Sequence, residues 1–369
     1  MNASEVQKYE SKPRDYKYTK LCEIKEACEG NYKTYCYAYV IDASAPYLST
    51  KTVGKFLCVL KLADDTLSPI AKDPKFKKTI KATFFGNRIE DIPHITSVGS
   101  IIRIHRAVAV HYNNNIQLNC DTTNMGAWCI FPHDTQADTT KYKPTRHCKK
   151  TYNYKEGVDM EFIDSCRIAF IEFVKDLRIF EFSESLLDAE KKNSKRRDFD
   201  ILGMLLEKKQ KKDKSGYKFK ICDYTKVASF ELSNDQANPF RFDSGELIRI
   251  RGCKYSENSF RKLIVKKHSN ILSIPSYSKT GMELLEKIRN SSCKEVSQYF
   301  VIYVQNLEER ILTVHSHEYE NKNPAFLKML TEKNSKEYLE GKNYLIEVFP
   351  FDVFPKKVMN WKSKDSYFN

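Results

Sequence analysis

Two short segments of the chain share one alternation of apolar and basic residues. Residues 99 to 106 read GSIIRIHR and residues 245 to 252 read GELIRIRG, 146 positions apart. Because successive side chains of a strand point to opposite faces, the isoleucines are expected to enter a core while the basic residues face away from it. The inward set is Ile102, Ile104, Ile248 and Ile250, and the outward set is Arg103, His105, Arg249 and Arg251. The repeat predicts one folding unit used twice, each with a positively charged exposed face.

Further apolar runs predict the other strands of the first unit. TYCYAYVIDASAP ends at Pro46, and the runs KFLCVLKLAD (55–64) and TIKATFFGN (79–87) follow it. After the turn-forming Asn113, Asn114 and Asn115 comes a fifth candidate, IQLNCDTT leading to GAWCIF. Five short strands in about 110 residues, without a long helix, fit a small antiparallel barrel better than a sandwich.

A linker helix and a second unit follow. Residues 132–157 are polar, and VDMEFIDSCRIAFIEFVKDLRIF then places apolar residues at helical spacing, which predicts an amphipathic helix packed between the barrels. The second unit starts at DFDILGMLLE, and its YKFKICD repeats the Asp-terminated strand LKLAD of the first unit. The segment KLIVKKHSNILSI is expected to close the second barrel as one strand.

The last 80 or so residues leave two alternatives open. A short helix from Lys279 to Asn290 ends the second barrel, SQYFVIYVQ, ERILTVHSH and YLIEVFPFDVF resemble strands, and FLKMLTEKNSKEYLEG resembles a helix. This order allows a third, reduced barrel or a small α+β cap. The predicted chain is thus mainly β with a linker helix: a polar arm (1–20), a first barrel (21–135), a linker (136–190), a second barrel (191–290) and a C-terminal region (291–369).

Composition favours an anionic partner. The chain carries 62 Lys and Arg against 48 Asp and Glu, a net charge of +14, and half of this excess lies between residues 190 and 220. A solvated surface is the alternative reading of that charge run. The 22 Tyr and 22 Phe exceed what core filling obviously requires, so some are candidate stacking platforms. The sequence contains no long apolar stretch and begins with a polar segment, which predicts a soluble intracellular protein without a membrane partner.

The cysteines do not form a metal-binding pattern. Eleven are present without a CxxC pair, and they lie mainly in apolar runs, so we expect reduced, mostly buried thiols. The nearest metal constellation is Cys129, His133, His147 and Cys148. Adjacent His147 and Cys148 would strain to ligate one ion together, so we expect neither a metal nor another cofactor.

An enzyme is the most distant alternative. Small β-barrels also occur in nucleases and in anticodon-binding tRNA ligases, and the adjacent acids Asp64 and Asp65 could hold a metal. A Mg²⁺ site needs carboxylates converging from several strands, however, and no HExxH, P-loop or GxSxG motif is present. We therefore expect a binding protein without catalytic activity.

Several ordered segments resemble one known family. APYLSTKT, FLCVLKLAD, FFGNRIEDIPHI and VGSIIRIHRAVAVHY, with a Gln five residues later, are similar to the first OB-fold of the alpha subunit of the ciliate telomere end-binding complex and of the protection-of-telomeres proteins. DFDIL, GELIRIRG and KHSNI look like the second OB-fold of the ciliate alpha subunit. The resemblance covers about residues 20 to 290 and implies tandem OB-folds that bind the single-stranded, G-rich 3′ overhang of a chromosome end.

The resemblance also implies site residues. Phe85 and Tyr112 fall where similar proteins stack bases, Tyr47 lies in the matching loop, and Thr52, Arg106 and Gln117 fall where DNA polar groups are contacted. His105, in the same basic segment, is a further candidate. In the second unit Asp198 aligns with a carboxylate that reads a guanine edge, Arg249 and Arg251 with a basic pair, and His268 with a stacking Tyr. Lys61 and Lys220 are either groove cations or plain surface.

The implied function has a close alternative and several implied partners. The chain is expected to cap the overhang, regulate telomerase access and reside in the nucleus at telomeres, with no cofactor. A replication-associated paralogue with looser sequence preference is the alternative. The aromatic that precedes the ciliate SSSW segment is replaced near Asn124, and the C-terminal region is shorter than the family's third OB-fold, where the beta-type partner subunit docks. Binding of such a partner is a further expectation.

Overall fold

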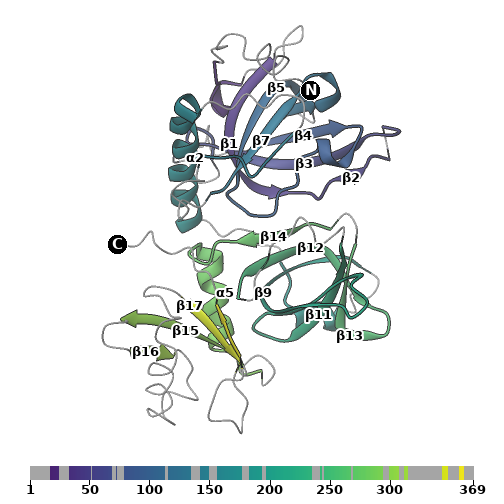
Figure 1. Ribbon diagram of the computed structural model, residues 1–369, viewed down its shortest axis with the longest axis vertical. Coiled ribbons are helices and arrows are strands. Elements are labelled where there is room, and N and C mark those ends of the chain that lie inside the picture. Colours follow the sequence, from purple (N-terminus) through teal and green to yellow (C-terminus); the bar gives the residue numbers. More distant parts are fainter. Residues whose placement is uncertain are drawn as a thin grey trace, which may run out of the picture.

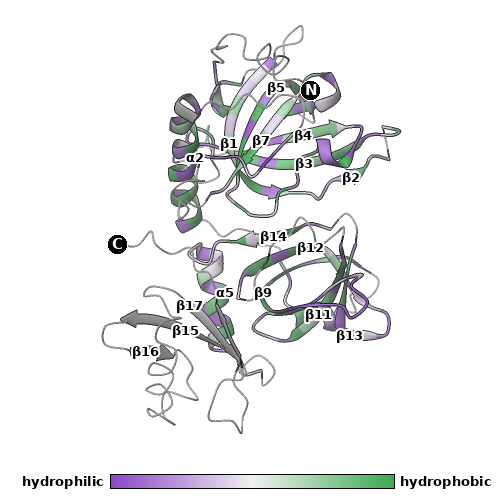
Figure 2. Cartoon of the chain, viewed as in Figure 1, coloured by the Kyte–Doolittle hydropathy of each residue, from purple (hydrophilic) through white to green (hydrophobic). Residues whose placement is uncertain are grey.

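Two β-barrels follow each other along the chain and lie one above the other, with α-helices along one side (Figure 1). The computed structural model describes residues 17–24, 33–50, 52–68, 72, 79–112, 115–133, 142–148, 156–176, 183–192, 197–234, 242, 245–266, 269–293, 299–306, 311–314, 343–347 and 357–360. Along strands such as Phe56–Ala63 and Gly216–Cys222, buried positions are interspersed with more exposed ones. Apolar residues, green in Figure 2, are spread over the strands of both barrels. The inward residues of each barrel form its core.

Five strands of the first sheet close into a barrel, and three short strands extend it. Its elements are β1 (Lys33–Ala43), β2 (Tyr47–Leu48), β3 (Phe56–Ala63), β4 (Ile80–Gly86), β5 (Ile101–Tyr112), β6 (Asn115–Asp121), β7 (Ala127–Phe131) and β8 (Arg146–His147). The order β1-β3-β4-β6-β5 closes because β5 pairs back onto β1, and only β4 and β6 are parallel. The fifth predicted strand is in fact two. The 3-10 turn η4 (Thr122–Asn124) and Met125, at φ +70°, separate β6 from β7. Both strands pair with β5, β6 along its second half and β7 along its first half.

The second barrel repeats this topology. It contains β9 (Phe199–Gln210), β10 (Gly216–Cys222), β11 (Val227–Ser233), β12 (Leu247–Ser256), β13 (Ser259–Val265) and β14 (Ile271–Ile274). The order β13-β11-β10-β9-β12 closes through β12 and β13, with β11 and β13 parallel. Strand β11 was not predicted from the sequence, and the expected closing strand is split into β13 and β14. The central prediction of tandem OB-folds is confirmed, with the repeated segments as the fourth strand of each barrel.

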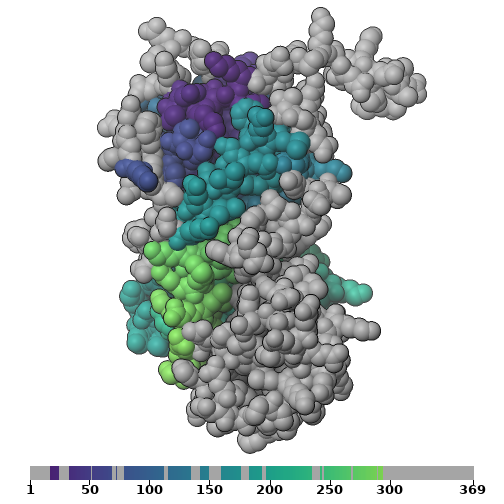
Figure 3. Space-filling view, turned by 90° about the vertical axis from the view of Figure 1, so that its left-hand side faces the viewer, coloured from purple at the N-terminus to yellow at the C-terminus, as the bar shows by residue number. Residues whose placement is uncertain are grey.

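Helices join the two barrels through a shared core. Helix α2 (Glu156–Asp176) packs on β1, where the rings of Phe170 and Phe173 each lie 5.6 Å from that of Tyr39. It also contacts α5 (Lys279–Arg289), as Figure 3 shows from the side. A short helix, α3 (Leu186–Lys191), precedes the second barrel. The core of the first barrel continues through these helices to Leu247, Leu272, Ile274, Leu284 and Ile288.

Smaller elements complete the described part of the chain. Two further 3-10 turns are η2 (Leu21–Glu23) and η3 (Ile89–Asp91). The C-terminal region contains an antiparallel sheet, in the order β16 (Ile311–Val314), β15 (Tyr299–Asn306), β17 (Asn343–Glu347) and β18 (Lys357–Asn360). The helix predicted over residues 326–341 lies outside the described residues, so the choice between a reduced barrel and an α+β cap stays open.

A glycine opens the fourth strand of both barrels in the same way. Gly99 has φ +84° and Gly245 has φ +93°, a region that residues with a Cβ rarely adopt. The amide of Gly99 donates to the carbonyl of Val40 in β1, and that of Gly245 donates to the carbonyl of Leu205 in β9. A Cβ on Gly99 would lie 2.2 Å from the Phe170 ring, so glycine also permits the close approach of α2.

A buried aspartate ends the second barrel strand of both units. Asp64 accepts hydrogen bonds from the amides of Leu21, Thr66 and Leu67, and from the Thr66 hydroxyl. Asp223 repeats this pattern with Leu186, Thr225 and Lys226. Each carboxylate therefore ties the turn after its strand to the segment that enters the barrel. Burial raises the pKa of Asp223, and these hydrogen bonds oppose the rise.

Replacement of Asp64 by Ala should destabilise the protein by about 2–4 kcal/mol, because several buried donors lose their acceptor at once. Asp65, the next residue, is a matched control. Its carboxylate is partly exposed and pairs with Lys20 at 2.8 Å, so Asp65→Ala should cost under about 1 kcal/mol. Urea denaturation of both variants measures the difference. Equal losses would show that the hydrogen-bond network of Asp64 has no special role.

Candidate nucleic-acid interface

One outer side of the first barrel is covered by α2. Arg103 is 2% exposed, pairs with Asp159 of the helix at 3.1 Å and donates to the sulfur of Cys129. His105 is 3% exposed, and its Nε2 lies 3.0 Å from the Tyr18 hydroxyl. The prediction that these two residues form an exposed basic face is therefore wrong. Alternation identifies the outward residues of a strand but does not reveal that a helix covers them.

Burial also changes the chemistry of His105. Burial, followed by the charges of Arg103 and Arg106, lowers the pKa of His105 to about 3. Its ring is therefore neutral at physiological pH. Because the ring is enclosed beside Tyr18, His105 offers little surface to a ligand, and its predicted role in DNA contact gains no support from its position.

A bulge at Arg106 changes which side chains of the fourth strand, β5, point outward. Arg106 has φ +60°, and the pairing of β5 with β1 shifts register at this point. Two successive side chains, His105 and Arg106, consequently lie outside the core, and the alternation is reversed beyond them. The Nη1 atom of Arg106 donates to the carbonyl of Met125 at 2.9 Å. Met125 also has positive φ, so this hydrogen bond joins two residues that both have an unfavourable backbone conformation.

The second copy of the repeat places a glycine at this bulge. Gly252 stands 146 positions after Arg106, has φ +66° and accompanies a register shift between β12 and β9. Glycine adopts this conformation without strain, whereas arginine does not. The barrel therefore needs a left-handed residue here, but it does not need an arginine. The backbone conformation alone therefore does not account for the arginine side chain at this position.

The side chains outside β3, β4 and β6 form what we call the open face. One row runs through Leu57, Phe85 and Asp121, and another through Lys61, Lys81 and Gln117. Phe84 is fully buried, whereas the neighbouring Phe85 is half-buried on this outer side. Lys61 is exposed, and Gln117 donates to Asn119 at 2.9 Å. The structure thus brings Phe85, Gln117 and Lys61 together on one sheet surface.

Loops at the rim of the open face supply further candidates. Tyr47 in β2 is exposed and pairs with Leu57, which continues the row of Phe85. Thr52 is exposed in the turn between β2 and β3, and its amide donates to Ser49. Tyr112 ends β5 opposite Asn115, and its side chain is outside the described part. Three apolar side chains are also exposed at these loops: Leu48, Val53 and Met125. The sequence alone does not distinguish such residues from core residues.

The predicted basic pair of the second barrel is engaged in an ion cluster between the barrels. Arg249 donates to Asp42 of β1 at 2.8 Å and to Asp200 of β9 at 2.5 Å. Arg251 lies 3.2 Å from the same Asp42 and is half exposed. Since the Arg249 side chain is only 8% exposed, the prediction that it faces solvent is wrong. Asp42, which the sequence analysis did not single out, joins the two barrels.

The other second-barrel candidates have less structural context. Asp198 is exposed and pairs with Lys266 at 2.5 Å. His268 lies outside the described residues, so its role stays a prediction. Lys220, at the outer side of β10, lies 3.5 Å from Glu207. Near the ion cluster, Asn270 donates to the carbonyl of Ala43, and β14 exchanges backbone hydrogen bonds with residues 96 and 98. These bonds fix the second barrel against the first.

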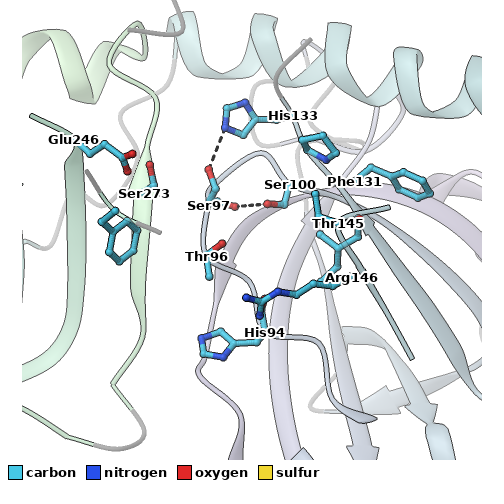
Figure 4. A pocket seen from close by; sticks show the side chains of 13 residues that line it. His94, Thr96, Ser97, Ser100, Phe131, His133, Thr145, Arg146, Glu246 and Ser273 are labelled. Atoms are coloured by element: carbon cyan, nitrogen blue, oxygen red, sulfur yellow. Dashed lines mark hydrogen bonds between the residues drawn. The ribbon is translucent and has the colours of Figure 1, made fainter. Parts of the chain in front are cut away.

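A cavity of about 460 Å³ with a mixed polar and apolar lining lies between the barrels (Figure 4). Ser97, Ser100, His133 and Arg146 line it from the first barrel, and Glu246 lines it from the second. Its polar groups bond to one another: Ser97 to His133 at 3.0 Å, and Ser100 to the carbonyl of Ser97 at 2.8 Å. Among the predicted site residues whose side chains the structure describes, none lines this cavity, which is therefore distinct from the open face.

The thiol and imidazole groups considered for a metal have other partners. The Cys129 sulfur accepts from Arg103, the Cys148 sulfur accepts from the amide of Trp128, and His133 bonds to Ser97. Ten cysteines of the described part are free thiols, eight of them buried, as predicted. Within the described residues no three potential ligands converge as a metal site would require. No described helix is long and apolar enough to span a membrane.

Comparison with known proteins decides the family. Residues 12–159 match the family model described as telomeric single stranded DNA binding POT1/CDC13, and residues 187–286 match the telomere end-binding protein alpha subunit OB2 domain. The two matches follow each other as the two barrels do. The chain belongs to the telomere end-binding protein family. The resemblance inferred from the sequence motifs is confirmed.

Curated members of the telomere end-binding family align with most of this chain. The telomere-binding protein subunit alpha of Sterkiella nova is 27% identical over 79% of this chain and 60% of its own length. The telomere-binding protein 51 kDa subunit of Euplotes crassus is 28% identical over 76% and 64%. The chain thus spans less than two thirds of these relatives. The crystal structure of fission yeast Pot1 and ssDNA aligns at a TM-score of 0.35 and 11% identity, over 76% of this chain and 95% of that chain.

Asp42→Ala should weaken the junction between the two barrels of this family member. The substitution leaves Arg249, a buried guanidinium, with one carboxylate partner instead of two, so we expect a loss of about 1–3 kcal/mol in unfolding free energy. Glu257, an exposed acid in the turn between β12 and β13, is the control, and Glu257→Ala should change stability by under about 0.5 kcal/mol. Hydrogen exchange at β14 should also accelerate in Asp42→Ala alone. Unchanged exchange would contradict a clamping role.

Proposed function

We propose that this protein binds the single-stranded, G-rich 3′ overhang of telomeres through the open face of its first barrel and thereby protects the chromosome end. Membership of the telomere end-binding family supports this proposal, as do the names of the relatives. The observation that carries it is Arg106, held in a strained conformation beside the open face, at a position where the second barrel has glycine.

The chemistry of the open face suits a single strand. Phe85 and Tyr47 offer ring surface for stacking, which contributes about 1–3 kcal/mol per base in such proteins. Gln117 and Arg106 supply hydrogen-bond donors for base edges, and Lys61 and Lys81 supply positive charge for phosphates. Arg106 is fixed by Met125, so its guanidinium is oriented before DNA arrives. Thr52 and Tyr112 are proposed to extend the face at its rim.

The second barrel and the C-terminal region are also part of the proposed function. Asp198, Arg251 and His268 are proposed to contact the strand where it reaches the second barrel. A nuclear location at telomeres and regulation of telomerase access follow from overhang binding. A beta-type subunit is proposed to dock on residues 291–369. Loss of its co-purification on deletion of that segment tests the docking, and co-purification that survives the deletion would contradict it.

Arg106→Gly separates function from folding. Glycine adopts the required φ without strain, so the unfolding free energy should change by less than about 1 kcal/mol. Affinity for a telomeric G-rich oligonucleotide should fall at least about tenfold, because a preset donor to the DNA is lost. Fluorescence anisotropy at physiological salt and urea denaturation measure the two quantities.

Controls for this experiment cover charge and sequence preference. Arg197, an exposed arginine that pairs with Glu184, lies outside both barrels, and Arg197→Ala should leave the affinity within about twofold. The wild-type protein should prefer the G-rich strand over a scrambled one. Equal affinities would favour the alternative, a replication-associated single-strand binder, since phosphate contacts alone would then account for binding. An unchanged affinity in Arg106→Gly would remove Arg106 from the interface.

A further inference from the structure

The strand register of the two barrels allows their outer faces to be compared residue by residue. Asp64 and Asp223 occupy the same place at the end of the second barrel strand, so Lys61 corresponds to Lys220, three residues earlier in each. Across the sheet, Lys61 pairs with Lys81 and then Gln117, whereas Lys220 pairs with Ser229 and then Lys262. The position of the amide Gln117 is therefore taken by a lysine.

The stacking residues of the open face have no counterpart in the second barrel. Leu57 and Phe85 form one cross-strand pair in the first barrel. The pair at the corresponding register in the second barrel is Gly216 and Ser233. Glycine and serine provide no ring or apolar surface on which a base could stack. At this register the second barrel therefore offers charge around the position, but no stacking ring.

Lysines dominate the face that replaces the stacking surface. Lys218 and Lys209 pair directly across β10 and β9, and both are exposed. Lys220 and Lys262 lie on the same outer side, and Lys211 reaches it from the β9–β10 turn. We call these five residues the lysine face. Two glutamates lie among them: Glu207 pairs with Lys209 and, at 3.5 Å, with Lys220, and Glu231 pairs with Lys211 at 2.8 Å and with Lys262 at 3.0 Å. The face has more positive than negative groups, which favours a polyanion.

We propose that the lysine face binds the phosphodiester backbone of nucleic acid that extends beyond the first barrel, without regard to its sequence. This inference rests on the proposed function, since the open face of the first barrel supplies the sequence-dependent contacts. Lysine ammonium groups act as point charges toward phosphates. When a phosphate binds, it replaces a glutamate as the partner of a lysine. The result is a second contact region whose contribution is electrostatic and falls with salt.

The test compares two triple variants that remove equal charge. Lys209→Gln, Lys218→Gln and Lys262→Gln together remove charge from the lysine face. Lys191→Gln, Lys192→Gln and Lys287→Gln remove the same charge from helix α3, its C-cap residue and helix α5. Affinity is measured across a salt series for a G-rich strand of about 8 nucleotides and for the same strand extended to about 24 nucleotides with unrelated sequence. Thermal unfolding of each variant checks that both barrels remain folded.

The lysine-face variant should reduce the salt slope of log K by about 2 on the extended strand, because about 0.7 is lost for each phosphate contact to a single strand. On the short strand both variants should match the wild-type protein. Equal slopes for the two variants on every extended substrate would overturn the proposal. A substrate whose extension is duplex distinguishes the two sources of phosphate. If the lysine-face variant lowers the salt slope with the duplex extension, the lysine face binds duplex. If it lowers the slope only with the single-stranded extension, the lysine face binds the overhang.

Failure of this inference differs from failure of the proposed function. If the wild-type protein binds G-rich and scrambled short strands equally, the function assigned to the open face is wrong, whatever the lysine face does. If the short G-rich strand is preferred and the two triple variants behave alike, only the lysine face is excluded.

Discussion

Both barrels depend on one backbone constraint, a left-handed residue in the fourth strand. A five-stranded sheet must bend sharply to close, and the bulges at Arg106 and Gly252 provide the bend in the two barrels. The same bulge reverses which side chains face outward. Before Arg106 the outer residues lie under α2, and from Arg106 onward they join the open face. One irregular residue therefore divides the strand between a structural half and a half that is available for binding.

The two barrels use their common topology for different purposes. The first exposes a half-buried ring, an amide and a fixed guanidinium on its outer sheet surface. The second directs Arg249 toward Asp42 of the first and carries lysines where the first has stacking surface. Because Arg249 is held by two carboxylates and the apolar core runs across the junction, the barrels form one body. A strand bound to the first barrel would then meet the second at a fixed distance, without the entropic cost of ordering a flexible linker.

Sequence alone predicted the topology better than the surfaces. The inward isoleucines, the linker helix and the correspondence between LKLAD in the first barrel and YKFKICD in the second could all be predicted from periodicity and repetition. Strand β11 was missed because VASFELS is short and only weakly apolar, and β6 was merged with β7 because the turn at Met125 carries no glycine or proline at its left-handed position. Arg103, His105 and Arg249 were assigned to solvent because alternation describes a single strand, whereas their burial depends on α2, Tyr18 and Asp42, which are distant in sequence.

The most direct test of the account is to map where a telomeric strand touches the protein. A G-rich single strand carrying 4-thiothymidine is irradiated with the full-length chain, and the cross-linked peptides are identified by mass spectrometry. We expect cross-links to peptides that contain Tyr47, Phe85 and Arg106, and none to α2. Cross-links confined to α2 or to the cavity between the barrels, at Ser97 and His133, would contradict it.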